Sequence, residues 1–263
     1  MLTFVDTAWV AERIDSVEIL LLDPRRPMKY MQGHLKNAVN LPAYRAFDEN
    51  HRLLSPEDLS AWIGAAGLDD ARIPVLYDSP QRQNASLLAW ILEHLGRDDV
   101  HLMNVLFEGW VEEGREIYYK PVEVPTAQFS ADVNAANRIT LDEMSGSASL
   151  QPSTFKLIDF RSREEYAGER GPNGARGHIP GAVNVAWEKL YGASHEYLLS
   201  GESLEGTLAD VGVKRNDPIV AYCQTGPRAS LGYLALRQHG YDVRLFDGSF
   251  AEWATLGLPA EVS

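Results

Sequence analysis

The first half of this sequence recurs, in the same order, in the second half. Residues 20–42 (LLLDPRRPMKYMQGHLKNAVNLP) resemble residues 156–186 (KLIDFRSREEYAGERGPNGARGHIPGAVNVA). Residues 73–96 (IPVLYDSPQRQNASLLAWILEHLG) resemble residues 218–240 (PIVAYCQTGPRASLGYLALRQHG), and residues 106–110 (LFEGW) resemble residues 245–250 (LFDGSF). Two such long copies indicate a duplicated domain, because solenoid repeats run to only about 20–45 residues.

Each copy alternates short aliphatic runs with amphipathic stretches. The runs at 19–22, 75–77, 157–158 and 219–222 are followed by turn-forming residues, which is typical of buried parallel strands. Leucines and isoleucines at helical spacing follow the second run of each copy. We therefore expect two α/β domains, each a mainly parallel central sheet flanked by helices, at residues 1–120 and 139–263, joined by a linker at 121–138 that is rich in Pro, Ala and Asn.

Composition and charge exclude several classes of protein. The 24 basic and 37 acidic residues give a net charge of −13, which repels nucleic acid and anionic membrane surfaces. No apolar run is long enough to cross a membrane, and the first residues lack the pattern of a secretory signal. A single cysteine excludes an internal disulfide and a multi-cysteine metal site, and it favours a reducing compartment. We expect a cytoplasmic protein, monomeric, with no metal and no nucleotide cofactor.

That cysteine, Cys223, lies between a predicted strand and a predicted helix. In α/β sheets ligands bind beyond the carboxyl ends of the strands. A helix N-terminus there offers unpaired N–H groups and a partial positive charge, which favour a thiolate and an attached anion. A buried structural cysteine is the alternative, but such a residue does not need the Gly226, Pro227 and Arg228 that follow within five residues.

The repeat, the block formed by Asp159, Arg161 and GHIPGAVN (177–184), and the CQTGPR loop (223–228) together resemble the tandem rhodanese-domain sulfurtransferases over nearly the whole chain. The resemblance implies that Cys223 becomes a persulfide inside a ring of backbone amides. It also implies that the first domain is catalytically inactive, since Asp78 stands at the position of the lost cysteine.

The loop departs from two known patterns of that family. It lacks the residues typical of thiosulfate-preferring animal enzymes and those of mercaptopyruvate enzymes, and it is closer to bacterial rhodaneses. A second arginine that the family uses for substrate binding falls at Glu165 here. Both thiosulfate and 3-mercaptopyruvate therefore stay open as donors.

Several further residues have a structural and a functional interpretation. Arg228 is expected to bind the donor's anionic group, and Gln224, Thr225, Gly226 and Pro227 to line the site, mainly with their backbone. Arg161 is either a second donor ligand or half of a structural ion pair. His34 and His178 occupy equivalent places in both copies, which favours local hydrogen bonds over catalysis, and Asp23 and Asp159 are expected to organise turns. Trp187 either lines the pocket or belongs to the core.

The sequence predicts a sulfurtransferase that moves sulfane sulfur from a small anionic donor to cyanide or a thiol through a Cys223 persulfide. A non-catalytic sulfur carrier or regulatory binding module, passing the persulfide to a protein partner, is the alternative. A cysteine phosphatase or arsenate reductase fits less well, because these enzymes place five residues between cysteine and arginine, whereas four separate Cys223 from Arg228.

Overall fold

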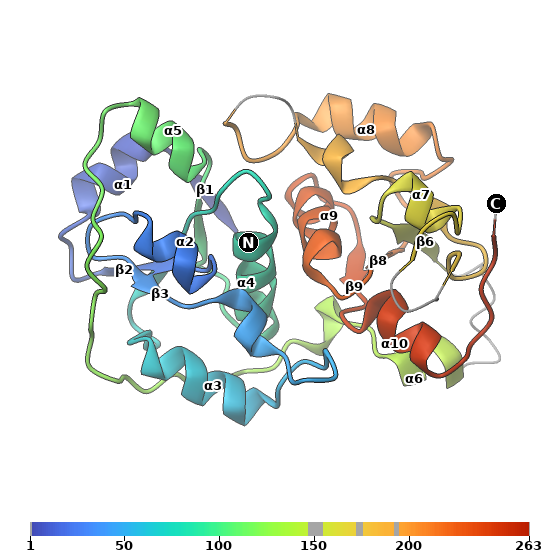
Figure 1. Ribbon diagram of the computed structural model, residues 1–263, viewed down its shortest axis with the longest axis horizontal. Coiled ribbons are helices and arrows are strands. Elements are labelled where there is room, and N and C mark those ends of the chain that lie inside the picture. The colour runs from blue at the N-terminus through green and yellow to red at the C-terminus, as the bar shows by residue number, and fades with distance from the viewer. Residues whose placement is uncertain (1, 147–154, 172–175, 192–194, 263) are drawn as a thin grey trace. The chain divides into compact units, whose positions relative to one another are not determined.

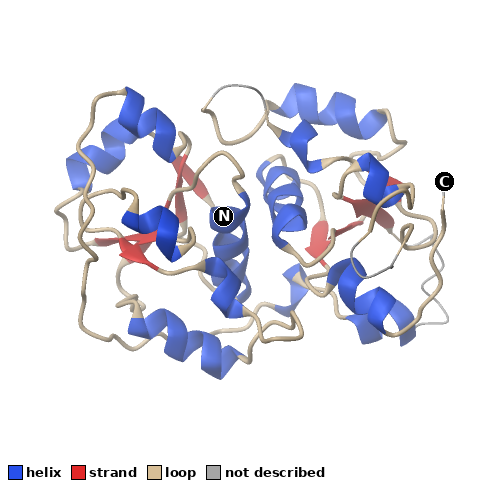
Figure 2. Cartoon of the chain, viewed as in Figure 1, coloured by secondary structure: helices blue, strands red, loops and turns tan. Residues whose placement is uncertain are grey.

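The computed structural model describes residues 2–146, 155–171, 176–191 and 195–262. These residues divide into two compact units. The first unit comprises residues 1–48, 53–134 and 193–197, and the second comprises 49–52, 135–192 and 198–263. In each unit the strands form a central parallel sheet with helices around it, which confirms the predicted α/β class (Figure 2).

The first unit has a five-stranded sheet with the strand order β1-β5-β4-β2-β3. Its pairings are all parallel. The elements run, in chain order, β1 Thr3–Val5, α1 Thr7–Arg13, β2 Ile19–Asp23, α2 Pro27–Met31, β3 Val39–Asn40, a short 3-10 helix Ala43–Ala46, α3 Pro56–Ala65, β4 Ile73–Leu76, α4 Gln83–His94, β5 His101–Met103 and α5 Phe107–Glu112 (Figure 1).

The second unit repeats this plan without a counterpart of β1 among the described residues, with the order β7-β6-β8-β9, again parallel. Its elements are a 3-10 turn Ala135–Asn137, α6 Leu141–Gly146, β6 Lys156–Asp159, α7 Arg163–Tyr166, β7 Val183–Asn184, a 3-10 helix Trp187–Leu190, α8 Gly201–Ala209, β8 Ile219–Tyr222, α9 Pro227–Gln238, β9 Val243–Leu245 and α10 Ser249–Thr255 (Figure 1).

The strands of the second sheet bring the site residues together. β8 is buried along its whole length, because a parallel sheet covered by helices hides both faces of a central strand. β6 and β8 pair in a register that sets Asp159 opposite Tyr222. The two strands therefore end level with each other, and the residues that follow them, Arg161 and Cys223, emerge at the same edge of the sheet.

The segment that the sequence predicts as a linker is extended, and as far as residue 134 it packs on the first unit. Ala127 N–H donates to the Gly64 carbonyl at 2.8 Å, and Asp132 N–H donates to the Leu95 carbonyl at 3.0 Å. Phe129 is buried. A side chain at Gly64 would place its Cβ only 2.4 Å from the Ala127 oxygen, so this close approach requires glycine. The segment therefore belongs to the body of the first unit.

Candidate active site

Cys223 directly follows β8, and its backbone is held on both sides. Its N–H donates to Ser249 Oγ at 3.1 Å, and its carbonyl accepts the Phe250 N–H at 3.0 Å. The side chain is 1% exposed, and Sγ accepts the Gly226 N–H at 3.2 Å. The sulfur therefore points into its own loop, where a backbone donor faces it.

Gly226 and Pro227 shape this loop. Gly226 has φ +103°, a conformation that residues with a Cβ rarely adopt, and it stands directly before the twelve-residue helix α9. Pro227 is the first residue of α9, where its missing N–H costs no helical hydrogen bond. Gln224 and Thr225 are half-buried. The Gln224 carbonyl accepts the Ala251 N–H at 2.9 Å, which ties the loop to α10.

Arg161 forms a buried structural ion pair with Asp159. Its guanidinium is fully buried and donates to both Asp159 oxygens, with Nη2–Oδ2 at 2.6 Å and Nε–Oδ1 at 3.0 Å. Nη2 also donates to the Gly177 carbonyl, and the guanidinium lies 4.1 Å from the centre of the Phe250 ring. Only Nη1 reaches the loop, 3.4 Å from Gln224 Oε1. The Asp159 pair is the structural role that the sequence offers for Arg161, and a role in donor binding stays a prediction.

Arg228, in the first turn of α9, forms a bidentate pair with Glu165. Nη1–Oε2 is 2.5 Å and Nη2–Oε1 is 3.0 Å, and the two side chains are 19% and 11% exposed. Burial lowers the pKa of Arg228, but the Glu165 hydrogen bonds and the charges of Cys223 and Glu165 raise it above its ordinary value. Burial raises the pKa of Glu165, and the Arg228 hydrogen bonds more than offset this, so the net shift is downward. Both groups are charged.

Sequence analysis places Glu165 at the position of a family arginine but does not predict this ion pair. The two residues lie 63 positions apart, and no local pattern links them. The usable signal is SREE (162–165), in which Ser162 and Glu165 form a capping box at the start of α7. That motif fixes the Glu165 side chain, and the fold then brings α9 to it.

The equivalent loop of the first unit is built around Asp78. The carboxylate is fully buried and accepts hydrogen bonds from Ser79 N–H at 2.8 Å, Ala85 N–H at 2.8 Å and Asn84 Nδ2 at 3.1 Å. Burial raises the pKa of Asp78 to about 6, while these donors act in the opposite direction. Two backbone amides of this loop, those of Ser79 and Ala85, are therefore already bonded to the Asp78 carboxylate.

Both halves of the sequence match one known domain family. The model of the Rhodanese-like domain matches the chain twice, at residues 6–113 and 140–256. The chain belongs to the rhodanese-like domain family. The two matches correspond to the two copies of the repeat, so the Cys223 loop lies in the second rhodanese domain and the Asp78 loop in the first.

Several known proteins are similar to this chain over nearly its whole length. A putative thiosulfate sulfurtransferase of Synechococcus elongatus is 29% identical, over 98% of this chain and 84% of its own length. The sulfur carrier protein TtuD of Thermus thermophilus is 28% identical, over 97% and 95%. The crystal structure of SseA from Escherichia coli, described as a 3-mercaptopyruvate sulfotransferase, superposes with a TM-score of 0.83 and 27% identity, covering 95% of this chain and 99% of that one.

The paired histidines of the two rhodanese domains make the local contacts that the sequence predicts. His34 Nδ1 lies 3.1 Å from the Tyr30 carbonyl, and His178 Nδ1 lies 2.9 Å from the Tyr166 carbonyl. Each imidazole stacks on the ring of that same tyrosine. In both domains these contacts tie the histidine, which lies just before the next strand, to the helix that precedes it.

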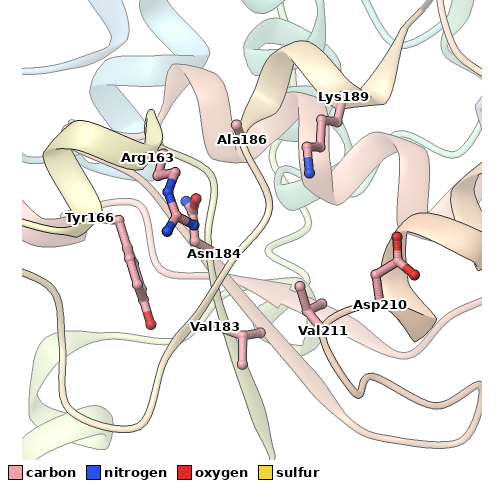
Figure 3. Close-up of a pocket in the computed structure, with 8 residues that line it drawn as sticks. All are labelled: Arg163, Tyr166, Val183, Asn184, Ala186, Lys189, Asp210 and Val211. Carbon is pink, nitrogen blue, oxygen red and sulfur yellow. The ribbon is translucent and has the colours of Figure 1, made fainter. Parts of the chain in front are cut away.

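A separate cavity of about 460 Å³ lies in the second rhodanese domain, beside the edge strand β7. Figure 3 shows Arg163 and Asn184 on one side and Lys189 and Asp210 on the other. Neither Cys223 nor Trp187 lines it. Trp187 is half-buried and lies against Tyr191 in a tilted arrangement. Asn184 uses its side-chain amide to hold the carbonyls of Asp159 and Arg161, which fixes the turn after β6.

No described helix combines the length and apolar character needed to cross a membrane. Among the same residues, no three His, Cys, Asp or Glu side chains are grouped so that they could hold a metal ion.

Proposed function

We propose that this protein is a sulfurtransferase whose second rhodanese domain, within residues 139–263, carries sulfane sulfur on Cys223, whereas the domain at 1–120 has no catalytic role. The observation that carries the proposal is the position of Sγ. Sγ lies inside a tight strand-to-helix loop, where the Gly226 N–H donates to it and α9 begins at Pro227. The relatives named as sulfurtransferases support the same chemistry.

The reaction has two displacement steps. In the first, the Cys223 thiolate attacks the outer sulfur of the donor, and a new S–S bond forms as the donor's own bond to that sulfur breaks. With thiosulfate, sulfite leaves with the electron pair and the enzyme keeps a persulfide anion. In the second, cyanide or a thiolate attacks the outer persulfide sulfur, which yields thiocyanate or a new persulfide and restores the Cys223 thiolate.

The loop supplies stabilisation and not proton transfer. The persulfide anion extends Cys223 by one sulfur atom into the loop, where backbone donors such as Gly226 N–H stabilise a negative charge without reorganising. The N-terminal end of α9 adds a partial positive charge. Arg228 provides a full positive charge close enough to interact with Cys223. Because the nucleophile reacts as the thiolate, no general base is required during the attack.

The test is the intact mass of the protein after incubation with thiosulfate or 3-mercaptopyruvate. The mass should increase by that of one sulfur atom, cyanide should return it to the starting value with release of thiocyanate, and Cys223→Ser should show neither change. A mass that stays constant with both donors and with an alkyl persulfide would contradict the proposal.

A sulfur carrier is the second candidate, favoured by the likeness to TtuD. The two functions differ in turnover. A carrier is loaded once and delivers its sulfur to a protein, whereas the enzyme forms many equivalents of thiocyanate from donor and cyanide. A phosphatase is less well supported, because both terminal guanidinium nitrogens of Arg228 already donate to the Glu165 carboxylate and an oxyanion would compete with it.

A further inference from the structure

Three arginines in or near the Cys223 loop form ion pairs with three carboxylates. Arg228 is paired with Glu165, and Arg161 with Asp159. Asp247, whose carbonyl lies beside Gly226, is paired with Arg138. These three arginines and three carboxylates cancel, so this group of described residues brings no excess positive charge to the loop. A thiolate at Cys223 makes the local charge negative.

Glu165 is the member of this group that bears directly on the donor. Its carboxylate accepts hydrogen bonds from both terminal nitrogens of Arg228, whose charge interacts with Cys223. A donor anion must therefore either displace this carboxylate or bind beside it. At close range in a partly buried site, like charges repel each other by more than they would in water.

The carboxylate is also held in place independently of Arg228. Ser162 N–H donates to Glu165 Oε2 at 3.2 Å, and Glu165 N–H donates to Ser162 Oγ at 3.3 Å, the two bonds of the capping box. Displacing Glu165 from Arg228 would leave its charge close to the entering anion, because the backbone that carries it is fixed at the start of α7.

We propose that Glu165 is a specificity-determining residue that selects sulfur donors by charge, so that this site prefers donors with little negative charge, such as small uncharged alkyl persulfides, over the thiosulfate dianion. This inference rests on the proposed function. With an alkyl persulfide, the Cys223 thiolate attacks the outer sulfur, the S–S bond of the donor breaks, and the alkyl thiolate leaves with the electron pair. The proton of the donor stays on the transferred sulfur.

The experiment compares thiosulfate, a dianion, with methanethiosulfonate, a monoanion with the same type of sulfur–sulfur bond. The rate constant kcat/KM for thiocyanate formation is measured for each donor with the wild type, Glu165→Gln and Glu164→Gln. Glutamine can keep the capping box, so Glu165→Gln removes the charge and one of the two acceptors of Arg228 but leaves the start of α7 intact. Glu164, the exposed neighbour on the same helix, is the matched control for the loss of one charge.

Glu165→Gln should raise kcat/KM for thiosulfate about ten- to a hundred-fold, and should raise that for methanethiosulfonate several-fold less. Glu164→Gln should change both by less than about two-fold. An unchanged or lower value with thiosulfate in Glu165→Gln would overturn the inference.

A measurement on the wild type alone keeps the inference testable if Glu165→Gln does not fold. Each donor's kcat/KM is divided by its rate constant for reaction with a simple thiolate in solution. The normalised value should be at least about tenfold higher for methanethiosulfonate, and equal values would contradict the proposal. If no donor loads Cys223 in any variant, the proposed function itself fails. If all donors load wild type and variant equally, only the inference on Glu165 fails.

Discussion

The two rhodanese domains share a polar framework and differ in what the framework surrounds. Arg25 in the first domain repeats the contacts of Arg161 in the second: a bidentate pair with the aspartate two residues earlier, a hydrogen bond to a glycine carbonyl, and an aromatic ring about 4 Å away. Tyr77 and Tyr222 likewise each accept a backbone N–H at the end of their strand. This network is present whether or not the loop carries a cysteine, so it belongs to the fold.

The Asp78 loop and the Cys223 loop differ in the side chain that accepts hydrogen bonds from their backbone N–H groups. The Gly226 N–H faces a sulfur that can be extended by one atom, whereas Ser79 and Ala85 donate to the Asp78 carboxylate. The first loop is also one residue longer, and its helix α4 begins after Arg82, which has φ +56°. This left-handed conformation costs free energy for a residue with a Cβ, so the backbone of the first loop is strained at Arg82. The first domain therefore has the same scaffold, but the Asp78 carboxylate occupies its loop.

The largest expected effect concerns the shared framework. Arg161→Ala should destabilise the second domain, and Arg25→Ala the first, by about 3–5 kcal/mol each, because either change leaves a buried aspartate without its partner. Chemical denaturation measures the loss, and hydrogen exchange read by mass spectrometry assigns it to a domain. A loss of activity in Arg161→Ala without any loss of stability would instead show that Arg161 binds the donor.

A smaller effect is expected where the domains differ in chemistry. Arg228→Ala should lower kcat/KM for all sulfur donors by about 10- to 100-fold, equivalent to about 1.4–2.8 kcal/mol. The variant loses the cation that interacts with Cys223 and leaves the Glu165 carboxylate without its partner. The double variant Arg228→Ala, Glu165→Ala should recover part of this loss. Equal activities of the single variant and the wild type would show that Arg228 has no influence on the cysteine.

The stability of the first domain should depend on pH through Asp78, a group that the Cys223 loop does not have. The pKa of Asp78 in the folded protein, about 6, lies above its ordinary value of 3.8. The folded state thus binds this proton more tightly, and the associated stability is complete below pH 3.8 and is lost as the pH rises through about 6. Between pH 4 and pH 7 the unfolding free energy of the wild type should fall by about 2 kcal/mol relative to Asp78→Asn. Parallel pH profiles of the two proteins, measured by urea denaturation, would refute the raised pKa.

Much of this organisation could be predicted from the sequence because it repeats there. The aliphatic runs at 19–22 and 219–222 are β2 and β8, and the position of Cys223 between a strand and a helix follows from its neighbours alone. The local contacts of His34 and His178 follow from their recurrence in both domains.

Contacts between distant segments could not be predicted in this way. The pairing of Glu165 with Arg228 depends on how α7 and α9 pack. The burial of Arg161 between Asp159 and the Gly177 carbonyl likewise depends on the fold of the segment up to residue 177. The packing of residues 121–134 along the first unit could not be predicted either, because a composition rich in Pro, Ala and Asn is typical both of a free linker and of an extended segment that packs.

The central claim is that Cys223 carries the sulfur and that the first domain's loop cannot, even when it is given a thiol. The most direct test uses the variant Asp78→Cys with Cys223 retained, treated with a sulfur donor and digested for peptide mass spectrometry. The account predicts one persulfide per chain, on the peptide that contains Cys223, with the peptide that contains residue 78 unmodified. A second, donor-dependent and cyanide-sensitive persulfide at position 78, formed at a rate comparable to that at Cys223, would contradict it.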